Sequence, residues 1–159
     1  MDTKSLEWQK TTESKIREAF DLFDKDKTDA VVQEEVGTIM RYLGAYPTER
    51  ALVLDILPAM QNDEPTGFVS YARFEKKMLE ILQTKQFEPD SSDIMLQAFK
   101  TLDSDNNGFI SAEVLENLLT TKGTGFRPKE LEAFLLIAKD SDTGNIYYED
   151  YIALLTKGL

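Results

Sequence analysis

The sequence has no cysteine and no histidine among its 159 residues. Without cysteine the chain can form no disulfide, no thiolate zinc site and no thiol nucleophile. Without histidine it also lacks the commonest side chain of catalytic proton transfer, and no other convergent catalytic set is evident. We therefore expect a protein that is not an enzyme.

Positive charge is also scarce, with 18 Lys and Arg against 29 Asp and Glu and a formal net charge of −11. Such an acidic chain is a poor match for nucleic acid or for an anionic membrane surface. It is a good match for a basic helix, although the same acidity would also serve simply to keep the protein soluble. Composition leaves both interpretations open.

Long apolar runs are missing as well. No stretch approaches the ~20 apolar residues that are needed to cross a bilayer, and the N-terminal segment MDTKS lacks the apolar core of a signal peptide. We therefore expect an intracellular protein. The hydrophobic share of 42% is ordinary for a globular protein and is enough for one compact domain or two small lobes.

What is present is an internal duplication. Phe20 and Asp24 in the first half correspond to Phe99 and Asp103 in the second, at a common offset of 79 positions (99 − 20 and 103 − 24). Within each half, apolar residues at i, i+3, i+4 and i+7 spacing flank two loops, which predicts two helix-loop-helix units. The expected fold is all-α, with four such units in two lobes.

The central apolar residue of each loop predicts how the units pair. These residues are Val31 and Val69 in the first half and Ile110 and Ile146 in the second. They can pair backbone to backbone as short antiparallel strands, and this pairing requires no metal. We expect one such pairing in each lobe.

The sequence also predicts where the lobes divide. We expect an N-terminal lobe over residues 1–83, which includes an N-terminal extension, a linker over 84–92 and a C-terminal lobe over 93–159. Pro89 opposes a continuous helix between the lobes, because the residue before a proline is pushed out of the α region. Ser91, Ser92 or Asp93 can cap the helix that follows.

Local features refine the first lobe. Gly44 is expected to end one helix, and Thr48 to cap the next. Pro58 lies inside the helix that enters the second loop, where it should kink or end that helix. Trp8 is expected ahead of the first helix, either packed on the lobe or serving as an anchor in an interface. The apolar stripe that enters the second loop ends one residue early and consists of Val53, Ile56, Leu57 and Met60.

Each loop can be laid over a 12-residue calcium-binding pattern. Calcium requires oxygens from positions 1, 3, 5, 7 and 9 and a bidentate Glu at position 12, with Gly at position 6 for the sharp turn. The second loop has Arg73 at position 12, where a cation repels the ion. The fourth begins at Lys139 and ends on the short carboxylate of Asp150. These two loops are therefore poor sites.

The first and third loops are weak candidates for Ca²⁺ or Mg²⁺. The first ends on Glu35, but Asp29 takes the glycine position, which demands a left-handed backbone. The third fits until Val114 replaces the final Glu. We expect that no ion is required, because Asp and Asn in such loops also make turns and caps. The candidate ligands are Asp24, Asp26, Thr28, Ala30 and Glu35 in the first loop and Asp103, Asp105, Asn107, Phe109 and Ser111 in the third.

The sequence resembles the calmodulin and light-chain family of EF-hand proteins over nearly its whole length. The resemblance rests on EAFDLFDKD at 18–26, LG at 43–44 with PTE at 47–49, and NGFISAE at 107–113. A more specific resemblance, to the subunit 8 family of the nexin–dynein regulatory complex (EF-hand calcium-binding domain-containing protein 2), rests on three further segments. They are EVGTIMRYLG at 35–44, NDEPTGFV at 62–69 and MLEIL at 78–82.

This resemblance implies a calmodulin-like fold and a place in the axoneme of motile cilia and flagella, which is part of the cytoskeleton. It implies a role in the structure that links neighbouring doublet microtubules and regulates dynein. The implied partners are long helical subunits of the same complex, some of them with IQ-type basic helices.

A calmodulin-like lobe that opens can hold a partner helix between its apolar stripes. Phe20, Phe23, Phe99 and Phe134 fit the sealed core better than the groove. Met95 is the only methionine of the second half, so that groove should suit one permanent partner. The predicted groove residues are Ile39, Met40, Leu57, Met60, Met78 and Ile81 in the first half and Leu115, Leu118, Leu119, Leu135, Leu154 and Leu155 in the second.

The favoured function is that of a non-enzymatic structural and regulatory subunit that clamps an amphipathic helix of a larger axonemal subunit, largely independently of calcium. One alternative is a calcium sensor whose first and third loops bind ion and open the lobes. Another is a myosin-type light chain, which shares the clamp but not the location. The sequence leaves open which subunit supplies the helix and whether both lobes grip it.

Overall fold

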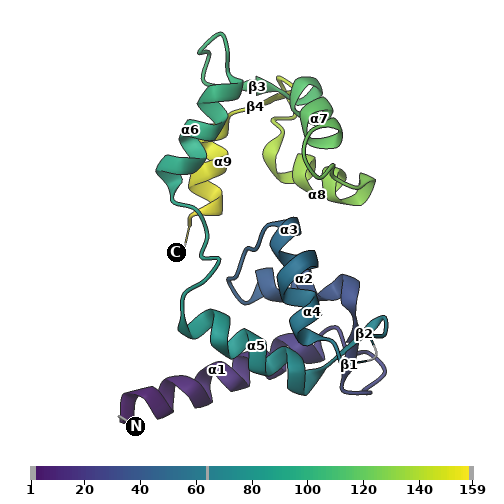
Figure 1. Cartoon of the computed structure of the whole chain (residues 1–159). Coiled ribbons are helices and arrows are strands. Elements are labelled where there is room, and N and C mark those ends of the chain that lie inside the picture. Colours follow the sequence, from purple (N-terminus) through teal and green to yellow (C-terminus); the bar gives the residue numbers. More distant parts are fainter. Residues whose placement is uncertain (1–2, 64, 158–159) are drawn as a thin grey trace. The chain divides into compact units, whose positions relative to one another are not determined.

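The computed structural model describes residues 3–63 and 65–157, and the chain divides into two compact units between Pro89 and Asp90. Each unit holds two helix-loop-helix pairs joined by a short two-stranded sheet (Figure 1). The predicted calmodulin-like, all-α architecture is confirmed. In unit 1 the elements are α1 (Thr3–Asp21), β1 (Ala30–Val32), α2 (Gln33–Tyr42), α3 (Glu49–Ala51), η1 (Leu52–Ile56), α4 (Leu57–Met60), β2 (Phe68–Ser70) and α5 (Tyr71–Gln83). In unit 2 they are α6 (Ser92–Leu102), β3 (Ile110–Ser111), α7 (Ala112–Thr121), α8 (Pro128–Ala138), β4 (Asn145–Ile146) and α9 (Tyr148–Leu155).

The strand pairing agrees with the prediction from the loop centres. β1 and β2 run antiparallel with Val31 opposite Val69. β3 and β4 do the same with Ile110 opposite Ile146. All four side chains are buried, so each short ladder also anchors the loop ends of its unit in the core.

Unit 1 has a closed core. Fifteen of its described residues form one buried apolar cluster, to which every helix except the single-turn α3 contributes. Phe20 of α1 packs against Phe74 of α5, with ring centroids 5.3 Å apart, and α1 and α5 lie side by side in Figure 1. This apolar burial is the main source of stability for the unit.

The helix ends in unit 1 follow the sequence signals. Gly44, just past the end of α2, adopts φ = 91°, a conformation that glycine takes without strain. The hydroxyl of Thr48 accepts a hydrogen bond from the N–H of Ala51 at 3.1 Å and caps the next helix.

Pro58 does not end the helix, but it changes the hydrogen bonding of the turn before it. Because proline has no N–H, it cannot close an α-helical bond to Leu54, and the preceding segment Leu52–Ile56 widens into a π-helix. The buried residues of this helix are Leu52, Ile56 and Met60, each four positions after the last. The expectation that Val53 belongs to the inward stripe is wrong, since its side chain is exposed.

Trp8 lies within the first helix rather than ahead of it. α1 begins at Thr3, because no proline or glycine interrupts the segment that precedes the apolar stripe. The side chain of Trp8 is 40% exposed. This corrects the expected start of the helix.

The segment between the units is anchored at its beginning. Phe87 packs against the core of unit 1, and its carbonyl accepts a hydrogen bond from the N–H of Tyr46 at 2.7 Å. Residues 84–89 of the predicted linker therefore lie with unit 1. The hydroxyl of Ser91 caps α6 by accepting from the N–H of Ile94. In the described ranges, no helix is both long and apolar enough to cross a membrane.

Candidate functional site

Unit 2 is open where unit 1 is closed. Its buried cluster contains five residues, and neither α6 nor α8 contributes a buried residue. α6 packs against α9, and α7 packs against α8 (Figure 1). The apolar side chains between these two helix pairs are therefore only partly covered.

Aromatic rings lie at the centre of this partly covered apolar surface, which we call the groove of unit 2. The ring of Tyr151 on α9 makes edge contacts with Phe99 of α6 at 6.3 Å and with Phe134 of α8 at 5.4 Å. All three side chains are half-buried. Edge-to-face packing gives them a defined arrangement while one side of each remains accessible.

The predicted groove residues differ between the units. In unit 1 five of the six are fully buried and Leu57 is half-buried, so in this closed arrangement they form the core. In unit 2 Leu115 is buried, Leu118, Leu119 and Leu135 are half-buried, and Leu154 and Leu155 are exposed. A groove in an opened unit 1 stays a prediction, whereas unit 2 already presents accessible apolar walls.

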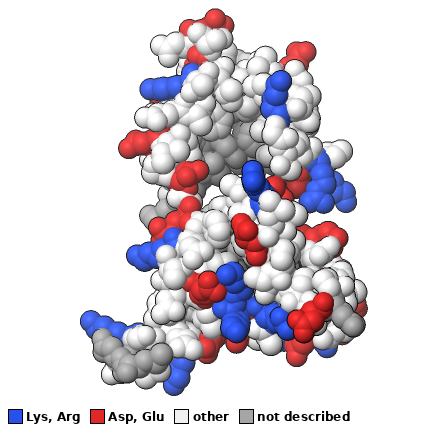
Figure 2. Space-filling model, in the orientation of Figure 1, with Lys and Arg blue, Asp and Glu red and all other residues white. Residues whose placement is uncertain are grey.

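Unit 2 is also the more acidic unit for its size. From Asp90 onward the sequence has 12 Asp and Glu against 6 Lys and Arg, a net charge of −6 (6 − 12). In Figure 2 the part formed by unit 2 shows wide areas without charge between scattered acidic and basic side chains. An apolar groove with an acidic surround suits an amphipathic helix that carries basic residues.

In the third loop, the carboxylate of Asp103 is already fully engaged. Oδ1 accepts from the N–H of Asn107 at 3.1 Å, and Oδ2 accepts from the N–H of Gly108 at 2.9 Å and from the hydroxyl of Tyr148 at 2.7 Å. The Tyr148 hydrogen bond, more than the backbone N–H groups, holds the pKa of Asp103 below its ordinary value. The same bond and burial raise the pKa of Tyr148 to about 12.

The first loop is fastened in a similar way by its own residues. Asp24 accepts from the N–H groups of Thr28 at 3.0 Å and Asp29 at 2.8 Å. Burial alone would raise the pKa of Asp24, but these hydrogen bonds outweigh it and leave that pKa lowered. Asp29 adopts the expected left-handed conformation, with φ = 57°, and Arg17 holds its carboxylate at 2.7 Å.

The second and fourth loops are also held by hydrogen bonds of their own residues. Nη1 of Arg73, at position 12 of the second loop, donates to the carbonyl of Gln61 at 2.8 Å, so a side-chain cation joins the two ends of the loop. In the fourth loop, Asp140 accepts from the N–H groups of Asp142 and Thr143, both at 2.9 Å. These hydrogen bonds lower the pKa of Asp140.

The ligand set of calcium fits these loops poorly. At position 12 the third loop presents Val114, which is half-exposed and has no oxygen to offer, and the second presents Arg73. Across 3–63 and 65–157, no three acidic side chains come together in a group that could hold a metal ion. Glu35, the position-12 residue of the first loop, lies in the first turn of α2.

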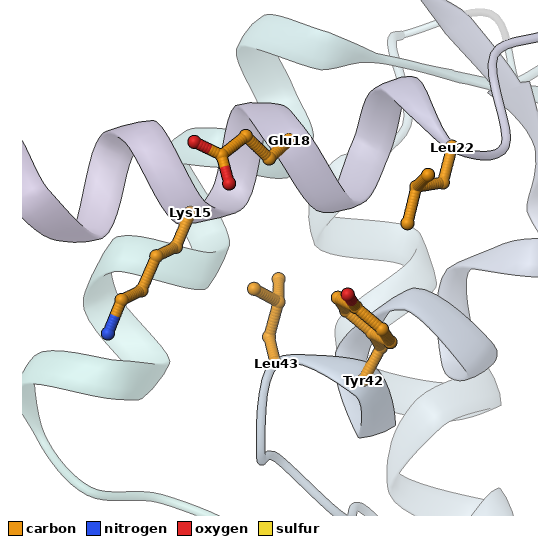
Figure 3. Close-up of a pocket in the computed structure, with 5 residues that line it drawn as sticks. All are labelled: Lys15, Glu18, Leu22, Tyr42 and Leu43. Carbon is orange, nitrogen blue, oxygen red and sulfur yellow. The ribbon is translucent and has the colours of Figure 1, made fainter.

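A second hollow lies on unit 1. It has a volume of about 540 Å³ and is lined by Lys15, Glu18 and Leu22 of α1 and by Tyr42 and Leu43 at the end of α2. Figure 3 shows Leu22, Tyr42 and Leu43 directed into the space between the two helices. The hollow is open to solvent, and its lining residues form no cluster of reactive side chains.

Known proteins match both the sequence and this fold. A family model described as an EF-hand domain pair matches residues 93–156. Dynein regulatory complex protein 8 of Mus musculus is 36% identical over 141 residues, which cover 89% of this chain and 85% of the relative. The protein of the same name from Chlamydomonas reinhardtii is 35% identical over 144 residues, covering 87% and 86%. The chain belongs to the EF-hand family that includes dynein regulatory complex protein 8.

Solved structures of light chains share the fold of this EF-hand protein. The Physarum polycephalum myosin II regulatory domain has a chain with TM-score 0.72 and 30% identity, covering 92% of this chain and 95% of that one. Mlc1p bound to IQ2 of Myo2p, a class V myosin, has TM-score 0.66 and 23% identity, covering 86% and 93%. The second likeness shows the fold alone.

Sequence reasoning about this EF-hand protein missed two residues. They are Tyr148, which holds Asp103, and Arg17, which holds Asp29. The signal for Tyr148 was its place two residues after Ile146, because alternate residues of an extended segment share a face. Its hydroxyl thus reaches the loop that Ile146 pairs with. Arg17 lies one helical turn before Asp21, to which it is also bonded at 2.7 Å, and no local pattern linked it to Asp29.

Proposed function

We propose that this protein is a non-enzymatic subunit of the dynein regulatory complex in ciliary and flagellar axonemes. In that role, unit 2 holds an amphipathic basic helix of a larger subunit, largely independently of calcium. Membership of the complex is supported by the name of the relatives, dynein regulatory complex protein 8. Helix binding is supported by the partly covered apolar groove of unit 2. Apolar walls around Tyr151 provide the area to bury, and the acidic surround complements basic residues on the helix.

Independence from calcium rests on the loops. Each has hydrogen bonds from its own residues at the places where an ion would be held, and the third lacks a position-12 carboxylate. A loop closed in this way keeps its shape without metal. The lobe therefore needs no ion to present its groove.

The direct test is binding of a synthetic amphipathic helix with Leu and Ile on one face and Lys and Arg on the other. We expect the purified protein to bind it with similar affinity in EGTA with magnesium and in calcium. A peptide of the same apolar pattern with Glu in place of Lys and Arg is the matched control and should bind much more weakly. Tight calcium binding with a large heat, together with newly exposed apolar surface, would instead favour a calcium sensor.

A myosin-type light chain is the second candidate, because the Physarum polycephalum chain shares 30% identity and the whole fold. Location separates the two. A tagged protein expressed in flagellated cells should stay with detergent-extracted axonemes and be recovered with other regulatory-complex subunits. Recovery with a myosin heavy chain and absence from axonemes would overturn the axonemal assignment.

A further inference from the structure

Unit 2 contains one buried polar link between distant segments. The hydroxyl of Tyr148 donates to Oδ2 of Asp103, and both residues are buried. In the described part of unit 2, it is the only hydrogen bond between side chains more than a few positions apart in the sequence. A buried hydrogen bond to a charged acceptor is among the stronger contacts that a small unit can make.

The two residues join two helix ends. Asp103 directly follows the last residue of α6, and Tyr148 is the first residue of α9. The ring of Tyr148 also stacks on Phe99 in the last turn of α6, at 5.5 Å and an interplanar angle of 3°. Ring and hydroxyl together tie the start of α9 to the end of α6, the two helices that form one side of the groove.

Unit 1 has the same tyrosine without the same bond. Tyr71 corresponds to Tyr148 by the offset that relates Val69 to Ile146 (148 − 71 and 146 − 69, both 77). Its ring meets Phe20 edge-on at 74°, and its hydroxyl donates to Glu75 in its own helix. Asp24 accepts its hydrogen bonds from Thr28 and Asp29 of its own loop. The closed unit is fixed by its large core, and the tyrosine link occurs only in the unit with the small core.

We infer that Tyr148 is the positioning residue of the groove, holding α9 to the loop end of α6 where an EF-hand would otherwise depend on an ion. This inference rests on the proposed function for its consequence, helix binding. The link itself is a property of the free protein. The two levels can therefore be tested separately.

The link is tested by a double-mutant cycle with Tyr148→Phe and Asp103→Ala in the full chain, measured by chemical unfolding in EGTA. We expect Tyr148→Phe alone to raise the unfolded fraction of unit 2 by about tenfold or more. It should add little once Asp103 is replaced. Tyr71→Phe is the matched control and should leave unit 2 unchanged. In NMR spectra, a slowly exchanging Tyr148 hydroxyl proton should be present in the native protein and absent in Asp103→Ala.

The consequence is tested on folded protein with the basic amphipathic peptide as probe. Tyr148→Phe should weaken peptide binding by about tenfold, while Tyr71→Phe should not. Equal unfolding of Tyr148→Phe and native protein would overturn the link. Weakened stability with unchanged peptide affinity would overturn the positioning role. If native protein binds no basic helix, the proposed function fails, and the unfolding cycle still decides the link.

Discussion

Units 1 and 2 descend from one repeated pattern yet use their apolar residues differently. Phe20 is fully buried in unit 1, whereas its counterpart Phe99 is half-buried in unit 2. Met78 is likewise buried, and its counterpart Leu155 (155 − 78 = 77) is 47% exposed. The difference shows that the repeat specifies helices and loop pairing, while the closing of the core depends on how the four helices meet. An unclosed core leaves apolar surface that a partner can bury.

Replacing the matched phenylalanines, Phe20 and Phe99, should reveal the largest difference in stability between the two units. Phe20→Ala removes a fully buried ring and should destabilise unit 1 by about 3–5 kcal/mol. Phe99→Ala should have roughly half that effect on unit 2, because part of the ring is already exposed. Urea unfolding, followed by Trp8 fluorescence for unit 1 and by amide NMR signals for unit 2, measures both. Equal losses would show that unit 2 is as closed as unit 1.

A polar side chain at the matched positions Met78 and Leu155 should affect stability in unit 1 and peptide binding in unit 2. Met78→Gln places an amide in a sealed core and should cost about 2–5 kcal/mol of stability. Leu155→Gln should change stability by less than about 0.5 kcal/mol, because the site is exposed. It should, however, weaken binding of the basic amphipathic peptide to unit 2. Thermal unfolding and peptide titration of both variants give the result, and a strongly destabilised Leu155→Gln would contradict the open groove.

An added carboxylate should give the third loop measurable affinity for calcium. Val114→Glu supplies the bidentate ligand at position 12, and we expect affinity on the order of 10⁻⁴ M that the native loop lacks. At 100 times that dissociation constant, calcium should stabilise the variant by about 2.7 kcal/mol. Calorimetry measures the affinity, and Val114→Gln is the control because it adds length without the charge. No heat from the Glu variant would mean that Asp103 is too firmly engaged to serve.

Removing the side-chain cation of the second loop should have a smaller effect. Arg73→Met deletes the hydrogen bond to the carbonyl of Gln61 and should destabilise unit 1 by about 1 kcal/mol. The exposed Arg50→Met is the control for lost charge and should be nearly neutral. Both are measured by urea unfolding. Identical curves for the two variants would show that Arg73 does not hold the loop.

Acid should loosen both units without mutation. The pKa values of Asp24, Asp103 and Asp140 are lowered in the folded protein, so their contribution is present above the ordinary aspartate pKa of about 3.9 and is lost as pH falls below it. Amide NMR signals of Thr28 and Gly108 report the two loops. We expect both signals to shift only at pH values below that ordinary pKa, and a shift centred at or above it would contradict the role of these carboxylates.

The fold could be predicted from the sequence, but whether the apolar core of each unit is closed or open could not. Loop centres such as Val31 and Ile110 carry a local pattern, so their pairing and the helices around them could be predicted. Whether Met78 and Leu155 are covered depends on helix packing across the whole unit, which has no local signature. The bond between Tyr148 and Asp103 spans 45 positions, and the π-helical shift at Pro58 moves Val53 off the expected face.

The π-helix in unit 1 has a consequence for changes of chain length. Its widened turn accommodates one more residue than an α-helix of the same rise would, and the extra residue is absorbed before the second loop rather than in it. The register of β2 against β1 is therefore insulated from a change of length upstream. Deletion of the exposed Val53 should be tolerated better than a deletion anywhere in Phe68–Ser70.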